Sequence, residues 1–290
     1  MRPAYPDCMD ESKQSVSKKV PASRSAPASD PFIFLKRNAF LQRISDAVRN
    51  GYTLYITGST KVDKVAFKSQ NMFERFNTNR SKTQEFRARA AGQTTARWLA
   101  FWEQDSELVI WVLLMNPAED LDKSEKWRDA SKDKITVGSW ELVRLSKPKT
   151  VLQRVETEAN PNASARKIVR VKGGKEVWTW RYNRARYDSL RNDIVTLIRT
   201  KNDRPLQELI ERIWGTPSHW GMRDQVKKLD QLVKEEWKRS RRSGESIPTM
   251  PKNRWLQRLT DSGCRWSHLM RNIKSTAADD AKPSRSAANG

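Results

Sequence analysis

Residues 94–115 read TTARWLAFWEQDSELVIWVLLM and contain two strand patterns separated by a short polar segment. The second pattern, Leu108 to Met115, is apolar at consecutive positions, which is typical of a strand covered on both faces inside a sheet. The first pattern covers Thr94 to Trp102, and Glu103 to Ser106 supplies the polar residues of a turn. We therefore predict two strands joined by this turn, with the second strand in the centre of a sheet.

Helix and strand patterns alternate upstream of this pair. Leu35, Phe40, Leu41, Ile44 and Val48 recur at helical spacing, and Asn50-Gly51 is a typical helix C-terminus. The sequence predicts a helix over 34–48, a strand over 52–57 with a turn at Gly58 and Ser59, and a helix over 65–76.

The strongest local signal downstream is Gly173-Gly174 between two β-rich runs, which predicts a hairpin over 167–172 and 175–182. Asn116-Pro117 followed by acidic residues indicates a helix start, and Trp140 to Leu145 a strand. Residues 146–166 lack a clear pattern and suggest a long mobile loop.

The rest of the chain is predicted to be helical, over 187–199, 206–214, 222–242 and 254–259. Met222, Val226, Leu229, Val233 and Trp237 form one apolar stripe on the longest of these helices. The fold class is therefore α+β, a mainly antiparallel sheet with flanking helices followed by a helical C-terminal region. We place the α+β domain at 31–200, with a basic hairpin near 167–182, the helical region with a basic arm at 201–274, and disordered tails at 1–30 and 275–290.

The charge is strongly basic, with 56 Lys+Arg against 34 Asp+Glu and a net charge of +22. Residues 31–116 carry 13 basic and 7 acidic side chains, residues 146–200 carry 13 and 5, and residues 238–274 carry 10 and 2. The excess therefore falls in three blocks. Blocks of this kind favour a composite basic face that contacts a polyanion, above all nucleic acid.

Several function classes are excluded by composition. The chain has no run of 18 apolar residues, so no membrane span is expected, and Met1 to Asp7 lacks the apolar core of a signal peptide. The two cysteines, Cys8 and Cys264, do not suggest a disulfide framework or a four-cysteine zinc site. A reducing, cytoplasmic location is the expectation.

Catalytic motifs are equally sparse. His219 and His268 lie far apart, so the paired histidines of a metal-dependent nickase are missing, and no Tyr follows His268 to serve as a recombinase nucleophile. The strand-to-helix segment at Gly58 lacks the second glycine of a phosphate-binding loop. Tyr182 and Tyr187 fit core positions better than a nucleophile pair. We expect no catalytic residues, no cofactor and no bound metal, and we favour a non-enzymatic role.

Three segments combine cations with polar or aromatic neighbours suited to nucleic acid. In 75–102 the only acid is Glu85, and a short helix ending at Gly92 carries part of the charge. The predicted hairpin could enter a groove as a two-stranded ribbon, and the tail beyond Lys238 could serve as a mobile arm. Trp255 and Trp266 in that tail would pack on the body or stack on unpaired bases. The candidate binding residues are Arg75, Arg80, Lys82, Arg87, Arg89, Arg97, Lys167, Arg170, Lys172, Lys175, Arg239, Arg241, Arg242, Arg254 and Arg258.

The expected function is nucleic-acid binding, with DNA favoured over RNA, and a chain of this composition would suit replication, partition or transfer of a mobile element such as a plasmid. One alternative is a protein-interaction adaptor that docks through its 12 tryptophans. A second alternative is a metal-dependent nuclease that uses Asp105, Glu107, Glu119 and Asp120. A helix start explains the acidic run at 119–125 more simply, since acids there complement the helix dipole.

Overall fold

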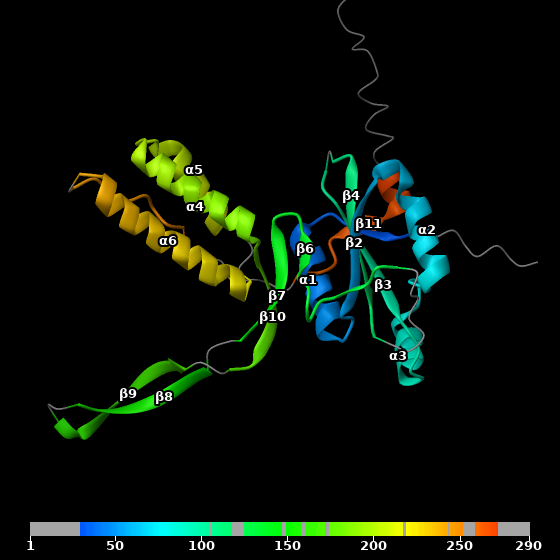
Figure 1. Cartoon of the computed structure of the whole chain (residues 1–290), viewed down its shortest axis with the longest axis horizontal. Helices are drawn as coiled ribbons and strands as arrows, with labels where there is room; N and C mark the ends of the chain where they lie inside the picture. The colour runs from blue at the N-terminus through cyan, green and yellow to red at the C-terminus, as the bar shows by residue number, and fades with distance from the viewer. Residues whose placement is uncertain are drawn as a thin grey trace, which may run out of the picture.

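The computed structural model describes residues 30–104, 106–117, 125–146, 149–157, 160–171, 174–216, 219–242, 244–251 and 259–271, and within 149–171 it describes the backbone only. Residues 1–29 and 275–290 of the two predicted tails and the segment 254–258 of the predicted last helix lie outside these residues. The predicted α+β class is confirmed: a mostly antiparallel sheet of six strands, a second sheet of three strands and flanking helices make up the fold (Figure 1).

The six-stranded sheet is built around the strand pair predicted from residues 94–115. Its order is β11 (Gly263–Arg265), β1 (Phe32–Phe34), β3 (Ala96–Trp102), β4 (Leu108–Met115), β2 (Leu54–Lys61) and β5 (Arg128–Asp129). β3 and β4 pair antiparallel, with Ala96 opposite Met115, and β1 joins β3 in parallel. The central position predicted for β4 is therefore confirmed, and its apolar run covers both faces of the sheet.

The turn predicted at Gly58 and Ser59 is wrong. β2 continues through both residues to Lys61, with Gly58 opposite Trp111 in the register. A Cβ atom on Gly58 would lie 2.4 Å from Cζ2 of Trp111, so the glycine makes room for the indole ring. This glycine serves close packing within a strand rather than a change of chain direction.

Helices cover the two faces of this sheet. α1 (Arg37–Arg49) packs on one face, ends at Asn50 as predicted, and is followed by Gly51 at φ +89°. α2 (Val65–Phe76) follows the short 3₁₀ turn η1 (Val62–Lys64) and packs on the other face with residues 266–271. α3 (Lys82–Ala90) then lies beside the start of β3, at one edge of the molecule (Figure 1).

The hairpin predicted over 167–182 is wrong. β10 (Glu176–Tyr182) pairs with β7 (Trp140–Ser146), and β7 in turn pairs with β6 (Ile135–Val137), which gives the three-stranded sheet. Trp180 of β10 is fully buried and donates a 2.8 Å hydrogen bond from Nε1 to the carbonyl of Leu41 in α1. A long-range partner for β10 therefore replaces the local partner that the Gly-Gly signal favours.

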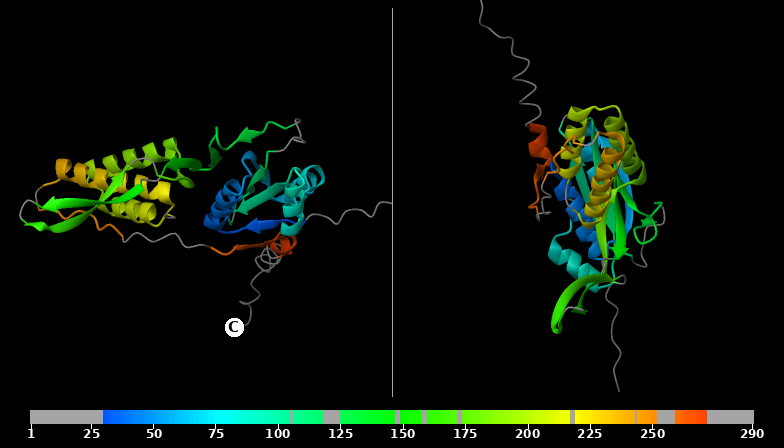
Figure 2. Two further views of the ribbon diagram at one scale, coloured as in Figure 1. Left: turned by 90° about the horizontal axis from the view of Figure 1, so that it is seen from below. Right: turned by 90° about the vertical axis from the view of Figure 1, so that its left-hand side faces the viewer.

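The loop predicted over 146–166 is also different in the structure. β8 (Lys149–Thr157) and β9 (Asn160–Val171) form a two-stranded antiparallel ribbon, in which Arg154 and Arg166 are Cα partners. Both strands pack extensively only against each other, and the ribbon extends away from the six-stranded sheet (Figures 1 and 2). The basic residues of β9 therefore belong to a ribbon that differs from the predicted one.

Three helices complete the fold: α4 (Arg184–Arg199), α5 (Asp203–Trp214) and α6 (Trp220–Ser240). They pack beside the three-stranded sheet, mainly through α6 and β10 (Figure 1). The apolar stripe predicted for the long helix is confirmed, because all five of its members are buried in the larger core: Met222, Val226, Leu229, Val233 and Trp237.

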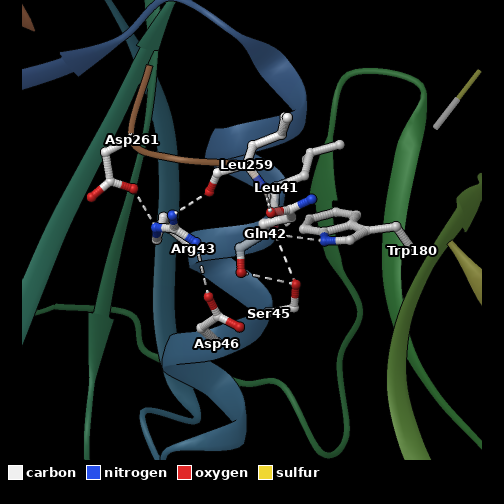
Figure 3. A network of polar contacts seen from close by, with 8 residues as sticks. All are labelled: Leu41, Gln42, Arg43, Ser45, Asp46, Trp180, Leu259 and Asp261. Carbon is white, nitrogen blue, oxygen red and sulfur yellow. Dashed lines mark hydrogen bonds and ion pairs between the residues drawn. The ribbon is translucent and has the colours of Figure 1, made fainter. Parts of the chain in front are cut away.

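The last described segment returns to the sheet, so the predicted mobile arm is wrong for residues 259–271. β11 pairs antiparallel with β1, and Trp266 and Leu269 are buried in the smaller core. Arg43 of α1 anchors the segment that leads to β11. It donates a 2.7 Å hydrogen bond to the Leu259 carbonyl and forms an ion pair with Asp261 (Figure 3). In Figure 2 this segment is orange and lies along the six-stranded sheet.

Candidate nucleic-acid interface

The helix α3 is an isolated polar element that begins with a capping box. Ser81 Oγ accepts from the backbone N–H of Gln84 at 3.3 Å, and the Gln84 side chain accepts from the Ser81 N–H at 2.7 Å. These reciprocal bonds satisfy the first free N–H groups of the helix and so favour helix formation at this point. Because only Glu85 and Ala88 of α3 are buried, most of its side chains face solvent.

Two cations of α3 stand free on its surface. Lys82 and Arg87 are exposed, and neither has a hydrogen-bond or ion-pair partner among the described residues. Arg87 and Arg89 lie in the last turn, where cations interact favourably with the helix dipole. Such side chains keep their full capacity to contact phosphate oxygens.

The only acid of α3 is already neutralised from within the protein. Glu85 is buried and accepts two hydrogen bonds from Nε of Arg97, at 3.1 and 3.2 Å, as well as a bond from Nη2. Burial lowers the pKa of Arg97, but the hydrogen bonds and charge of Glu85 outweigh burial and raise the pKa above its ordinary value. Glu85 is therefore engaged by Arg97 inside the protein, and it forms no ion pair with the surface cations Lys82 and Arg87.

Two arginines lie over one buried tyrosine beside α3. The guanidinium carbon of Arg97 lies 4.5 Å from the ring centroid of Tyr52, and that of Arg89 lies 5.2 Å from it. Tyr52 is fully buried, and its hydroxyl accepts a 3.2 Å hydrogen bond from Thr95 Oγ1. The ring thus acts as a fixed support for both guanidinium groups.

A pocket opens between this support and α3. Its volume is about 540 Å³, and it is lined by Tyr52, Lys82, Glu85, Phe86, Arg89, Ala90 and Arg97. Phe86 is 74% exposed and is the only large apolar side chain of α3. The pocket therefore combines cations, one paired carboxylate and an exposed aromatic ring.

The other two predicted residues of this segment have structural partners. Arg80 donates to the carbonyl of Thr94 at 2.9 Å and is half-buried, which ties the start of α3 to the start of β3. Arg75 pairs with Glu125 and lies with its guanidinium carbon 4.8 Å from the ring centroid of Phe76. The structure thus groups Lys82, Arg87, Arg89 and Arg97 and sets Arg75 and Arg80 apart from them.

The residues predicted on one hairpin are divided between two elements. Lys167 and Arg170 lie on β9, where their Cα partners are Gln153 and Thr150. Lys175 is exposed just before β10, which belongs to the other sheet, and Lys172 lies outside the described residues. The structure therefore does not form the single basic hairpin that the sequence suggested.

The C-terminal candidates differ sharply from one another. The Arg241 side chain is only 3% exposed, pairs with Asp203 and with Glu245 at 3.3 Å, and lies 4.4 Å from a ring centroid of Trp237. Arg241 is therefore a structural residue, and its assignment to the binding surface is wrong. Arg239 and Arg242 are exposed, with Arg239 at 3.6 Å from Glu236. Arg254 and Arg258 lie outside the described residues.

The aromatic residues of the tail offer no stacking surface in the described segment. Trp266 is buried in the smaller core, so the hypothesis that it stacks on bases is wrong, and packing on the body is confirmed for it. Trp255 lies outside the described residues. None of the 11 tryptophans that the structure describes is exposed, and ten of them are buried or packed against one of the two cores.

Tyr182 is buried and shares a 2.7 Å hydrogen bond with Thr216, and burial raises its pKa, which agrees with a core position. Burial also raises the pKa of the Cys264 thiol. The described residues hold no cluster of three metal-ligating side chains. Of the acids proposed for a nuclease, Glu107 is exposed, and Asp105, Glu119 and Asp120 lie outside the described residues.

Tyr52 and Phe86 belong to this site but were not among the predicted residues. Phe86 left a usable signal, because it is a lone aromatic residue in an otherwise polar and small-residue helix. Tyr52 left none, since it reads as the first residue of a strand 30 residues before Lys82. Comparison of the chain with protein-family models, curated proteins and solved structures finds no match. No helix among the described residues is long and apolar enough to span a membrane.

Proposed function

We propose that the protein binds nucleic acid without catalysing a reaction on it, and that α3 is the centre of the contact surface. One observation carries the proposal: α3 exposes Lys82, Arg87 and Arg89, while its single acid, Glu85, is buried against Arg97. The positive charge of this surface has no counterion among the described residues, and phosphate groups are the ligands that such charge attracts.

The proposed partner is DNA in preference to RNA, in the cytosol. On composition alone, we place this binding in replication, partition or transfer of a mobile element. The adaptor alternative receives less support, because the described tryptophans face the two cores rather than solvent. A docking surface built on tryptophan requires exposed rings.

The test uses three fluorescent 20-nucleotide probes of one sequence: single-stranded DNA, duplex DNA and single-stranded RNA. Binding is measured by anisotropy between about 50 and 300 mM salt, with and without Mg²⁺. We expect a slope of log K against log [salt] of about −4 to −8, because several phosphates are neutralised together. A slope shallower than about −2 would contradict the proposal, and cleavage of a probe upon addition of Mg²⁺ would favour the nuclease alternative.

A further inference from the structure

We propose that the pocket beside α3 receives an unpaired nucleobase, so that the protein prefers single-stranded to duplex nucleic acid; this inference rests on the proposed function. The pocket volume of about 540 Å³ is large enough for one nucleotide. Its polar and aromatic lining offers contacts to both halves of such a ligand, the charged backbone and the flat base.

The aromatic contact comes from Phe86. This ring is 74% exposed on a helix whose other side chains are polar, charged or small, so it makes little contribution to the core. A base that stacks on an aromatic ring contributes about 1–3 kcal/mol to binding, and the stacking tolerates any base. The position of Phe86 at the pocket rim therefore suits a stacking role.

The second contact comes from the arginines over Tyr52, which line the same pocket. Their guanidinium groups are held by the buried ring, and Arg97 is fixed further by the Glu85 carboxylate. A guanidinium plane that is already held loses little side-chain freedom when a base stacks on it or a phosphate binds to it. Glu85 is thus a positioning residue, which orients Arg97 rather than touching the ligand.

The geometry selects an unpaired base for a simple reason. In a duplex, both faces of every internal base are covered by its neighbours, so an aromatic ring at a pocket rim cannot reach them. In a single strand the bases can separate and expose a face. Lys82, at the start of α3 and on the pocket wall, lies where it could contact the backbone of the same strand.

The experiment compares two exposed phenylalanines of neighbouring helices. Phe86→Ala removes the proposed stacking ring, and Phe67→Ala removes a ring of α2 that is 77% exposed and does not line the pocket. Both full-length variants are tested at fixed salt with the single-stranded DNA, duplex DNA and single-stranded RNA probes. Phe86→Trp serves as the conservative variant, because a larger ring still stacks.

We expect Phe86→Ala to weaken binding to the single strands about 5- to 150-fold, as loss of one stacked base requires, and to change duplex binding less than twofold. Phe67→Ala should change neither, and Phe86→Trp should restore single-strand affinity. The two single-stranded probes separate DNA from RNA as the source of the base.

Two results would overturn the inference: a loss for Phe86→Ala that is equal on single strands and duplex, or no loss on either. The proposed function would still stand in both cases, provided that the wild-type protein binds with a steep salt dependence. If the wild-type protein binds none of the three probes, the proposed function fails first, and the inference fails with it.

Discussion

The helix α3 and the C-terminal end of α6 look alike in sequence, yet their cations have different surroundings. Lys82, Arg87 and Arg89 lie within eight residues of one another, and Lys238 to Arg242 place four cations in five residues. On α3 the only acid is buried in an ion pair with Arg97. At the end of α6, by contrast, acids from three places in the chain meet the cations: Asp203, Glu236 and Glu245.

Local charge density therefore does not identify a binding surface. Asp203 belongs to α5 and lies 38 residues before Arg241, so no local pattern reveals their ion pair. A cation that is already paired and buried is part of the fold, and removing it changes stability. Removing a cation that has no partner changes mainly the affinity for a ligand.

Truncation after Trp237 should have the largest effect, because it removes β11, Trp266 and Leu269 as well as Arg241. Each buried apolar side chain of this size contributes roughly 1.5–3 kcal/mol, so the loss should amount to several kcal/mol. Thermal unfolding measures it, with truncation after Arg271 as the control. An unchanged melting temperature after truncation at Trp237 would mean that the C-terminal segment is a separate arm after all.

His219 should make stability depend on pH. Burial and the charges of Arg49 and Arg223 lower its pKa to about 4, against an ordinary value of about 6.5. Between these values the unfolded chain binds more protons than the folded chain, so stability rises with pH across this window and is complete above about 6.5. The effect should reach up to about 3 kcal/mol.

The measurement is chemical denaturation of wild type and His219→Gln between pH 4 and 7. The difference in unfolding free energy between the two proteins should change with pH, because only wild type has His219. The carboxylates that titrate in this range are common to both proteins, so their contributions cancel in the difference. A difference that stays constant from pH 4 to 7 would contradict the burial of a neutral His219.

Arg241→Ala should destabilise the fold by about 1–3 kcal/mol, since it breaks two ion pairs and uncovers Trp237. Its matched control is Arg242→Ala, which removes an exposed cation next to it and should cost less than about 0.5 kcal/mol. Denaturant unfolding separates the two variants. Equal effects of the two substitutions would remove the distinction between paired and free cations at this end of α6.

Much of the fold can be predicted from sequence where the signal is local. The strand run at Leu108 to Met115 and the stripe of α6 reflect burial that each segment shows by itself. The errors have a common cause in long-range contacts. Gly58 reads as a turn until Trp111 is placed opposite it, and Gly173-Gly174 reads as a hairpin until β7 takes β10 as its partner.

Only part of the candidate site could be predicted from the sequence, for the same reason. Lys82, Arg87 and Arg89 stand in a basic run that the sequence displays directly. Tyr52 supports Arg89 and Arg97 only because the segment that follows α1 lies beside the start of β3 in the folded chain. Contacts of this kind leave no trace in spacing or composition, so the pocket could not be predicted although its cations could.

The location of the interface on α3 is tested most directly by two matched double substitutions. Lys82→Ala/Arg87→Ala removes one lysine and one arginine from α3, and Lys238→Ala/Arg239→Ala removes the same pair of residue types from the exposed end of α6. All four side chains are exposed, so neither variant should lower the melting temperature by more than a few degrees.

Affinity for the single-stranded DNA probe is measured for both variants across the salt series. The α3 variant should lose about tenfold or more, with a salt slope shallower by about 1 to 2, while the α6 variant should lose less than about threefold. An equal loss for the two variants, or a greater loss for the α6 variant, would contradict an interface centred on α3.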